Sequence, residues 1–223
     1  MTSHPEQFAN HDAGEAPVSG FLHRASTAGQ GFLVLTHGAG GNSKSPLLVA
    51  LAERFAEAGI TTLRCDLPFR QRKATGPPSP SDAKHDQDGL RRALALMREQ
   101  FPGHAFLSGS SYGGRQGSIL AGADPSVADC LLLLSYPLHP PGRPAQLRTA
   151  HFAELRVPTL FVSGTRDSFG TIEELENAIK LIPARTKLIA IEGAAHGLSQ
   201  KSVAKDLPQK IVDEFLSFVE VKK

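Results

Sequence analysis

The sequence is poor in cysteine and has no apolar stretch suited to a membrane or to secretion. Only Cys65 and Cys130 are cysteines, and both lie in apolar runs typical of buried strands. Two isolated cysteines form neither a disulfide framework nor a metal site, so we expect free, buried thiols and no metal. Residues 1–16 lack the apolar core of a secretory signal, and the longest apolar run, 130–134, is far shorter than the roughly 20 residues of a membrane helix. These absences predict a soluble, cytoplasmic protein without a membrane partner.

An excess of charge of one sign is also missing. Lys and Arg number 24 and Asp and Glu number 22, which gives a formal net charge of +2. Nucleic-acid binding depends on clustered basic residues, and here they are scattered, so we expect no nucleic-acid partner. The 223 residues are 40% hydrophobic and 21% charged, an ordinary globular composition for a single domain with a sizeable core.

From residue 18 onward, short apolar runs alternate with helical patterns. This alternation predicts an α/β fold: a mostly parallel, twisted sheet with helices on both faces. The polar residues 1–17 have little to bury and are expected to form a flexible arm, which leaves 18–223 as a single domain. Residues 69–84 are rich in proline and glycine and are expected to form a surface loop or a small lid. Strands are predicted over residues 31–36, 61–65, 105–108, 130–135, 159–163 and 187–191.

A G-x-S-x-G motif lies at the junction of a predicted strand and a predicted helix. It reads Gly109-Ser110-Ser111-Tyr112-Gly113. This setting is the one that a nucleophile elbow requires, because the sharp turn presents the central serine at the end of the sheet. The positions two residues before and after that serine must be small to avoid the adjacent strand and helix, and both are glycine. Ser111 is therefore the predicted nucleophile.

A base and an orienting acid follow later in the chain. A serine hydroxyl needs a base to attack at neutral pH, and His196 follows the last predicted strand in a Gly/Ala-rich loop. Asp167 directly follows the preceding predicted strand, where it could hold His196 in the correct tautomer. The order Ser, Asp, His is that of the α/β-hydrolase fold. Asp124 and Asp129 are alternatives for the acid, although neither directly follows a predicted strand.

Acyl transfer also needs N–H donors for an oxyanion. One is expected from Tyr112, the residue after the nucleophile. The second is expected from the glycine-rich loop 37–41 after the first buried strand, where glycines let the backbone approach a substrate. Ala39 is the preferred donor, with Gly38 and Gly40 as alternatives.

Six further residues are predicted to line the substrate pocket. Arg115 is unusual because a cation in the first turn of a helix opposes the helix dipole; it either pairs with a buried carboxylate or favours an acidic substrate group. Tyr136 and His139 lie at a strand end, where a structural role and a pocket role both remain open. The predicted substrate-binding residues are His37, Gly38, Gly40, Arg115, Tyr136 and His139.

Several segments together resemble the Tex30/KANL3-like branch of the α/β-hydrolases, a relative of the dienelactone hydrolases. They are 37–42, 62–64 with 68–71, 109–115, 136–142 and 158–167. The resemblance implies a compact hydrolase core with little or no cap domain. Two departures stand out: dienelactone hydrolases use a cysteine nucleophile where this chain has a serine, and Tyr112, Ala194 and Ala195 replace residues expected in the branch.

These observations predict a serine hydrolase that acts on small carboxylic esters, thioesters or related acyl compounds through an acyl-enzyme. Such chemistry needs no cofactor, and the expected partner is a small-molecule acyl substrate. The protein is expected to be a monomer or a homodimer. Two alternatives stay open at this point: a non-catalytic protein-interaction module that retains the fold, and a hydrolase of amide or carbon–carbon bonds.

Overall fold

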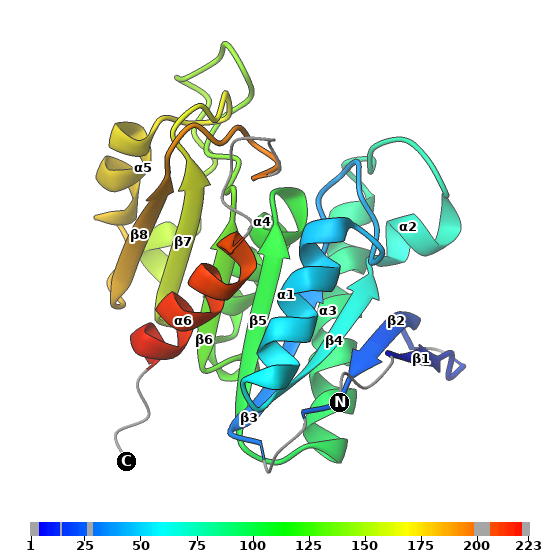
Figure 1. Ribbon diagram of the computed structural model, residues 1–223. Helices are drawn as coiled ribbons and strands as arrows, with labels where there is room; N and C mark the ends of the chain where they lie inside the picture. The colour runs from blue at the N-terminus through cyan, green and yellow to red at the C-terminus, as the bar shows by residue number, and fades with distance from the viewer. Residues whose placement is uncertain (1–4, 14, 26–28, 199–205, 220–223) are drawn as a thin grey trace.

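The computed structural model describes residues 5–13, 15–25, 29–198 and 206–219. An eight-stranded sheet forms its centre, with helices on both sides (Figure 1). In chain order the strands and helices are β1 (Glu6–Asn10), β2 (Val18–His23), β3 (Gly31–Thr36), α1 (Pro46–Glu57), β4 (Ile60–Asp66), α2 (Pro68–Arg72), α3 (Asp82–Gln100), β5 (His104–Ser110), α4 (Tyr112–Ala123), β6 (Cys130–Leu134), β7 (Thr159–Gly164), α5 (Ile172–Ile179), β8 (Thr186–Ile191) and α6 (Leu207–Val219), with short 3₁₀ turns at Pro125–Val127 and Phe152–Glu154.

The strand order is β1-β2-β4-β3-β5-β6-β7-β8. Strands β3 to β8 pair in parallel, whereas β1 and β2 add two antiparallel strands beyond β4. Strands β3, β6 and β7 are buried along their whole length, which explains why they read as continuous apolar runs and not as alternating ones. The predicted fold class, a mostly parallel sheet with helices on both faces, is confirmed.

Two apolar cores lie on opposite faces of the sheet. Helices α1 and α6 cover one face, where Phe215 packs edge-on against Phe55 and Phe106 at centroid distances of 5.6 and 5.2 Å. Helices α3, α4 and α5 contribute to the core on the other face. Figure 1 shows α1 and α6 in front of the sheet, with α3 and α4 behind it. Two covered faces leave the loops at the strand ends as the place for a site.

Two expectations about segments outside the core need correction. The predicted flexible arm contains a strand, because residues 6–10 pair with β2 in register from Glu6 opposite Leu22 to Asn10 opposite Val18. The predicted loop 69–84 is helical at both ends, since α2 ends at Arg72 and α3 starts at Asp82. In both segments, backbone pairing or helix formation satisfies polar groups that a loop would leave to water.

Both cysteines are free and buried, as predicted. Burial raises the pKa of each thiol to about 12, so neither is a ready nucleophile. Within the described ranges, none of the helices is both long and apolar enough to cross a membrane.

Candidate active site

The turn from β5 into α4 holds Ser111 in a strained backbone conformation. Its φ is +48° and its ψ is −115°, a region that residues with a side chain rarely adopt. The Ser111 N–H donates to the carbonyl of Leu134 at the end of β6, at 2.8 Å. The strain is thus held by the neighbouring strand, and the hydroxyl is presented above the carboxyl end of the sheet, as an elbow requires.

The glycines on either side of Ser111 have no room for a side chain. A Cβ on Gly109 would lie 2.4 Å from the backbone nitrogen of Gly114, and a Cβ on Gly113 would lie 2.4 Å from the carbonyl oxygen of His37. Both distances are far below van der Waals contact. The close approach of Gly113 to His37 also brings the first turn of α4 against the loop after β3.

Adding a methyl group at Gly109 is expected to destabilise the protein. In Gly109→Ala the new Cβ meets backbone atoms that cannot move aside, so we expect the free energy of unfolding to fall by about 2–3 kcal/mol. Gly122→Ala, in the neighbouring helix α4, is the control: its Cβ would meet nothing closer than 3.5 Å, and alanine should stabilise the helix by up to about 1 kcal/mol. Urea denaturation measures both changes, and equal stabilities for the two variants would contradict the close packing at Gly109.

Three predicted residues meet in one hydrogen-bonded row. Ser111 Oγ lies 2.7 Å from His196 Nε2, and His196 Nδ1 lies 2.9 and 2.8 Å from the two carboxylate oxygens of Asp167. The Asp167 side chain is 1% exposed and that of His196 is 24% exposed. A buried carboxylate that accepts from Nδ1 leaves Nε2 free to accept a proton from the serine hydroxyl.

The two alternative acids lie elsewhere. Asp124 follows α4, where it caps the short 3₁₀ turn after it and pairs with Arg91. Asp129 accepts a hydrogen bond from the N–H of Ala105 at the start of β5, the opposite end of the sheet from Ser111. Neither carboxylate is in the row with His196.

Phe169 fixes the histidine from the side, a contact that the sequence analysis missed. Its ring stacks on the His196 imidazole with centroids 4.0 Å apart and planes 25° apart. The Phe169 N–H donates to Asp167 Oδ1 at 2.9 Å, so the same residue also orients the carboxylate. In the sequence, the signal for this contact was an aromatic residue two positions after the predicted acid. Stacking limits the ring to rotations within its own plane, which keeps Nε2 directed at Ser111.

The glycine-rich loop after β3, residues 37–41, lies beside the serine. A Cβ on Gly38 would be 3.3 Å from the Ser111 Cβ, so this stretch of backbone passes directly over the nucleophile. Gly38, Ala39 and Gly40 all line the same cleft as Ser111. We call residues 37–41 the oxyanion loop, after the role that the sequence predicts for them.

His37 supports the oxyanion loop through contacts of both its ring nitrogens. The residue is 1% exposed, and burial lowers the pKa of its imidazole, which favours the neutral ring. Its Nε2 accepts the N–H of Leu67 at 3.1 Å, and its Nδ1 lies 2.8 Å from the carbonyl oxygen of Gly38. Both ring nitrogens are therefore occupied by backbone groups, and His37 borders the cleft as a support for the loop.

Tyr112 belongs to the elbow through its backbone and to the core through its side chain. Its hydroxyl donates to Asp86 Oδ2 at 2.7 Å, and Asp86 Oδ1 accepts the N–H of Phe69 at 2.9 Å. Burial, followed by the neighbouring Asp86, raises the pKa of the Tyr112 hydroxyl above its ordinary value. Burial also raises the pKa of Asp86, which is fully enclosed. Asp86 thereby links α2, α3 and the start of α4 at the rear of the elbow.

The cleft in front of Ser111 has a volume of about 620 Å³. Apart from the oxyanion loop, its lining side chains include Leu47, Leu48 and Phe169, so its walls are largely apolar. No residue of the segment 69–84, which the structure describes completely, lines the cleft, so that segment is not a lid over it. In the part of the chain that the structure describes, no three His, Cys, Asp or Glu side chains are grouped to hold a metal ion.

Three of the predicted substrate-binding residues are not among those that line this cleft. The Tyr136 hydroxyl donates to the Arg148 carbonyl at 2.6 Å, inside a cluster with Phe152 and Phe161. His139 is 5% exposed and lies 3.3 Å from a carboxylate oxygen of Glu174. These side chains are occupied within the protein, which corrects the expectation that they contact a substrate.

Arg115 is the third of these residues. Its Nε is buried without a hydrogen-bond partner. Among the described residues it forms no ion pair, so the first of the two alternatives, pairing with a buried carboxylate, is absent. Its charge instead acts on Tyr136, where it lowers the hydroxyl pKa in opposition to the larger effect of burial, which raises it.

The strand order and the strained serine at the β5–α4 turn define an α/β-hydrolase. The chain matches the family model described as "Alpha/beta hydrolase domain" over residues 29–220, and it belongs to that family.

Solved structures share this fold over almost their whole length. A dienelactone hydrolase from Anabaena variabilis ATCC 29413 superposes with a TM-score of 0.75 at 20% identity, covering 97% of this chain and 99% of that one. Est1E from Butyrivibrio proteoclasticus has a TM-score of 0.75 at 16% identity, with 96% and 98% covered. XC6422 from Xanthomonas campestris, described as an α/β serine hydrolase without lid, has a TM-score of 0.71 at 16% identity, with 100% and 99% covered. At these identities the likeness shows a common fold.

Proposed function

We propose that this protein is a serine hydrolase of small carboxylic esters, thioesters or related acyl compounds. The observation that carries the proposal is the unbroken row from Asp167 through His196 to Ser111, with a 2.7 Å contact between base and nucleophile. That row ends in a strained elbow and opens into an apolar cleft. The fold neighbour that is named as a dienelactone hydrolase supports ester-type substrates. The resemblance to the Tex30/KANL3-like branch remains part of this proposal.

The proposed reaction has two halves. In the first, His196 Nε2 takes the Ser111 proton while Oγ attacks the carbonyl carbon, and the carbonyl π electrons move onto oxygen. Asp167 stabilises the resulting imidazolium. When the tetrahedral intermediate collapses, His196 gives that proton to the departing alcohol or thiol, which leaves an acyl-serine. In the second half His196 removes a proton from water, water attacks the acyl carbon, and the Ser111 oxygen leaves with the proton.

The oxyanion of each tetrahedral intermediate is assigned to two backbone N–H groups, those of Ala39 and Tyr112. Tyr112 starts α4, so its N–H is one of the helix's unpaired donors and carries the positive end of the helix dipole. Ala39 belongs to the oxyanion loop, which passes over the Ser111 side chain. Such donors stabilise charge that develops only during the reaction, and each is typically worth about 100- to 1,000-fold in rate.

The cleft favours a small, uncharged acyl group. Its walls carry Leu47, Leu48 and Phe169, and among the residues that the structure describes His37 and His196 are the only lining side chains that can carry a charge. An apolar wall of this kind stabilises a short alkyl or aryl group, whereas a charged group would lose its hydration there without gaining a partner.

The test is covalent labelling with a fluorophosphonate probe, read by mass spectrometry. The wild-type protein is expected to gain one adduct, located on Ser111, and Ser111→Ala is expected to gain none. A screen of p-nitrophenyl esters and acyl thioesters of two to eight carbons then ranks acyl length. A folded wild-type protein that stays unlabelled and turns over no ester would contradict the proposal and favour a protein-interaction module on the same fold.

A further inference from the structure

Arg70, a residue outside the catalytic row, holds the oxyanion loop in place. We propose that Arg70 is a positioning residue that fixes the peptide group after Ala39, next to the peptide group that carries the Ala39 N–H donor. This inference rests on the proposed hydrolase function. The residue lies in α2 and is 7% exposed, so its guanidinium is enclosed by protein.

Its guanidinium donates to four backbone carbonyls. Nη2 donates to Ala39 at 2.7 Å and Nε donates to Gly41 at 2.9 Å, both within the oxyanion loop. The remaining bonds reach Lys73 at 2.9 Å and Gly76 at 3.0 Å, in the segment after α2. A planar guanidinium with its five N–H donors can satisfy several acceptors in fixed directions, which a lysine ammonium cannot do. All four acceptors are neutral backbone carbonyls, so these hydrogen bonds hold the backbone and do not pair the arginine with a carboxylate.

Because the peptide bond is planar, a contact that holds a carbonyl also fixes the direction of the N–H in the same peptide group. In a trans peptide the carbonyl of one residue and the N–H of the next point in opposite directions. The Gly38 carbonyl is held by His37 Nδ1 at 2.8 Å and by the Gly41 N–H at 3.1 Å, which directs the Ala39 N–H to the other side. The Ala39 carbonyl is held by Arg70. Both peptide groups that flank the Ala39 Cα are therefore fixed, one by His37 and one by Arg70.

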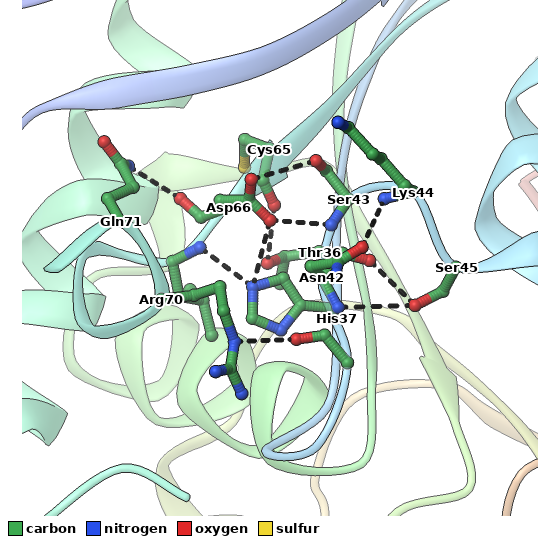
Figure 2. Close-up of polar contacts among 12 residues, drawn as sticks. Thr36, His37, Asn42, Ser43, Lys44, Ser45, Cys65, Asp66, Arg70 and Gln71 are labelled. Carbon is green, nitrogen blue, oxygen red and sulfur yellow. Dashed lines mark hydrogen bonds and ion pairs between the residues drawn. The ribbon is translucent and has the colours of Figure 1, made fainter. Parts of the chain in front are cut away.

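The far end of the loop is fixed by a separate carboxylate. Asp66 accepts the Ser43 N–H at 2.6 Å and the Ser43 hydroxyl at 3.0 Å. Figure 2 shows the Asp66 carboxylate beside both Ser43 and the His37 imidazole, with the Arg70 side chain near the same imidazole. His37 supports the loop where it leaves β3, and Asp66 supports the chain after it through Ser43. Between these two supports, Arg70 binds the carbonyls of Ala39 and Gly41. Its removal would free the centre and leave both ends attached.

The test compares Arg70→Met and Arg70→Lys with the control Arg72→Met. Arg72 lies in the same helix, is 52% exposed, and pairs with Asp82 at the surface. With p-nitrophenyl acetate, kcat is measured per active site titrated by the fluorophosphonate, which removes any effect of misfolded protein. For Arg70→Met we expect kcat to fall about 10- to 100-fold with KM within about threefold, because a displaced donor weakens the transition state more than the ground state. Arg70→Lys should recover part of the loss.

Amide hydrogen exchange of the peptide that spans the oxyanion loop is measured on the same proteins. Faster exchange at residues 38–41 in Arg70→Met, but not in Arg72→Met, supports the positioning role. A kcat per site equal to that of Arg72→Met, or unchanged loop exchange, overturns it while the hydrolase function stands. If the wild type neither reacts with the probe nor turns over ester, the proposed hydrolase function is wrong, and Arg70 has no role in catalysis. Hydrogen exchange alone then reports whether Arg70 holds the loop.

Discussion

Ser111→Ala is expected to lower kcat for ester hydrolysis by about 10⁵- to 10⁶-fold, the scale seen when a serine hydrolase loses its nucleophile. Alanine removes the hydroxyl oxygen that lies 2.7 Å from His196 Nε2 and would attack the substrate, so no acyl-enzyme can form. What remains is the rate of water attack on a substrate held by the oxyanion donors. The measurement is steady-state turnover of p-nitrophenyl acetate, with the initial burst of p-nitrophenol as a second reading; the burst should disappear.

Ser110→Ala separates the role of Ser111 from that of its neighbour. Both serines line the cleft, and they are adjacent in the motif. The Ser110 hydroxyl is not in the row with His196, so its loss should change kcat by less than about tenfold, the scale of a side chain that contacts substrate without reacting. If Ser110→Ala abolished the burst while Ser111→Ala stayed active, the nucleophile would be Ser110, and its assignment to Ser111 would be wrong.

Asp167→Asn is expected to cost about 10⁴-fold in kcat, because an amide in this place favours the wrong imidazole tautomer. Both carboxylate oxygens accept from His196 Nδ1 at 2.8–2.9 Å. The amide nitrogen of asparagine would donate to Nδ1, which would place the ring proton on Nε2, facing Ser111. Base catalysis then has no free acceptor, although the shape of the side chain is conserved. KM should change little, since Asp167 does not line the cleft.

Asp124→Asn and Asp129→Asn are the controls for Asp167. Both are aspartates near the elements that flank the site, and both bind groups remote from His196. Each is expected to retain the wild-type kcat within about twofold, as surface substitutions usually do. A loss in either variant comparable with that of Asp167→Asn would show that the acid has been misassigned.

The sequence predicts the catalytic row better than the pocket around it. Ser111, Asp167 and His196 come after β5, β7 and β8 of the parallel sheet, and the rule that parallel strands place their carboxyl ends together is enough to bring the three residues close to one another. The need for glycine at 109 and 113 follows from the same turn. These predictions use backbone geometry, which the local sequence encodes.

Side-chain directions could not be inferred in this way. Tyr136 and His139 follow β6 as pocket residues would, yet their polar atoms face the Arg148 carbonyl and Glu174. Strand β1 has only five residues, whose exposure varies without a clean alternation, so periodicity does not reveal it. The bonds of Arg70 go to backbone carbonyls, which every residue has, and no residue pattern marks them. Such contacts depend on tertiary packing alone.

Hydrogen bonds at the carboxyl ends of the strands link the elbow to β6, β7 and β8, whose residues are not among those that line the cleft. The residue after β5 donates its N–H to β6 (Ser111 to Leu134), the residue after β6 to β7 (Ser135 to Val162) and the residue after β7 to β8 (Thr165 to Ile191). Ser135 has the same φ of +48° as Ser111, so two neighbouring turns share one unfavourable geometry. Each is stable only while the next strand is in position. We therefore expect the site to lose its geometry on heating together with β6, β7 and β8, in a single event.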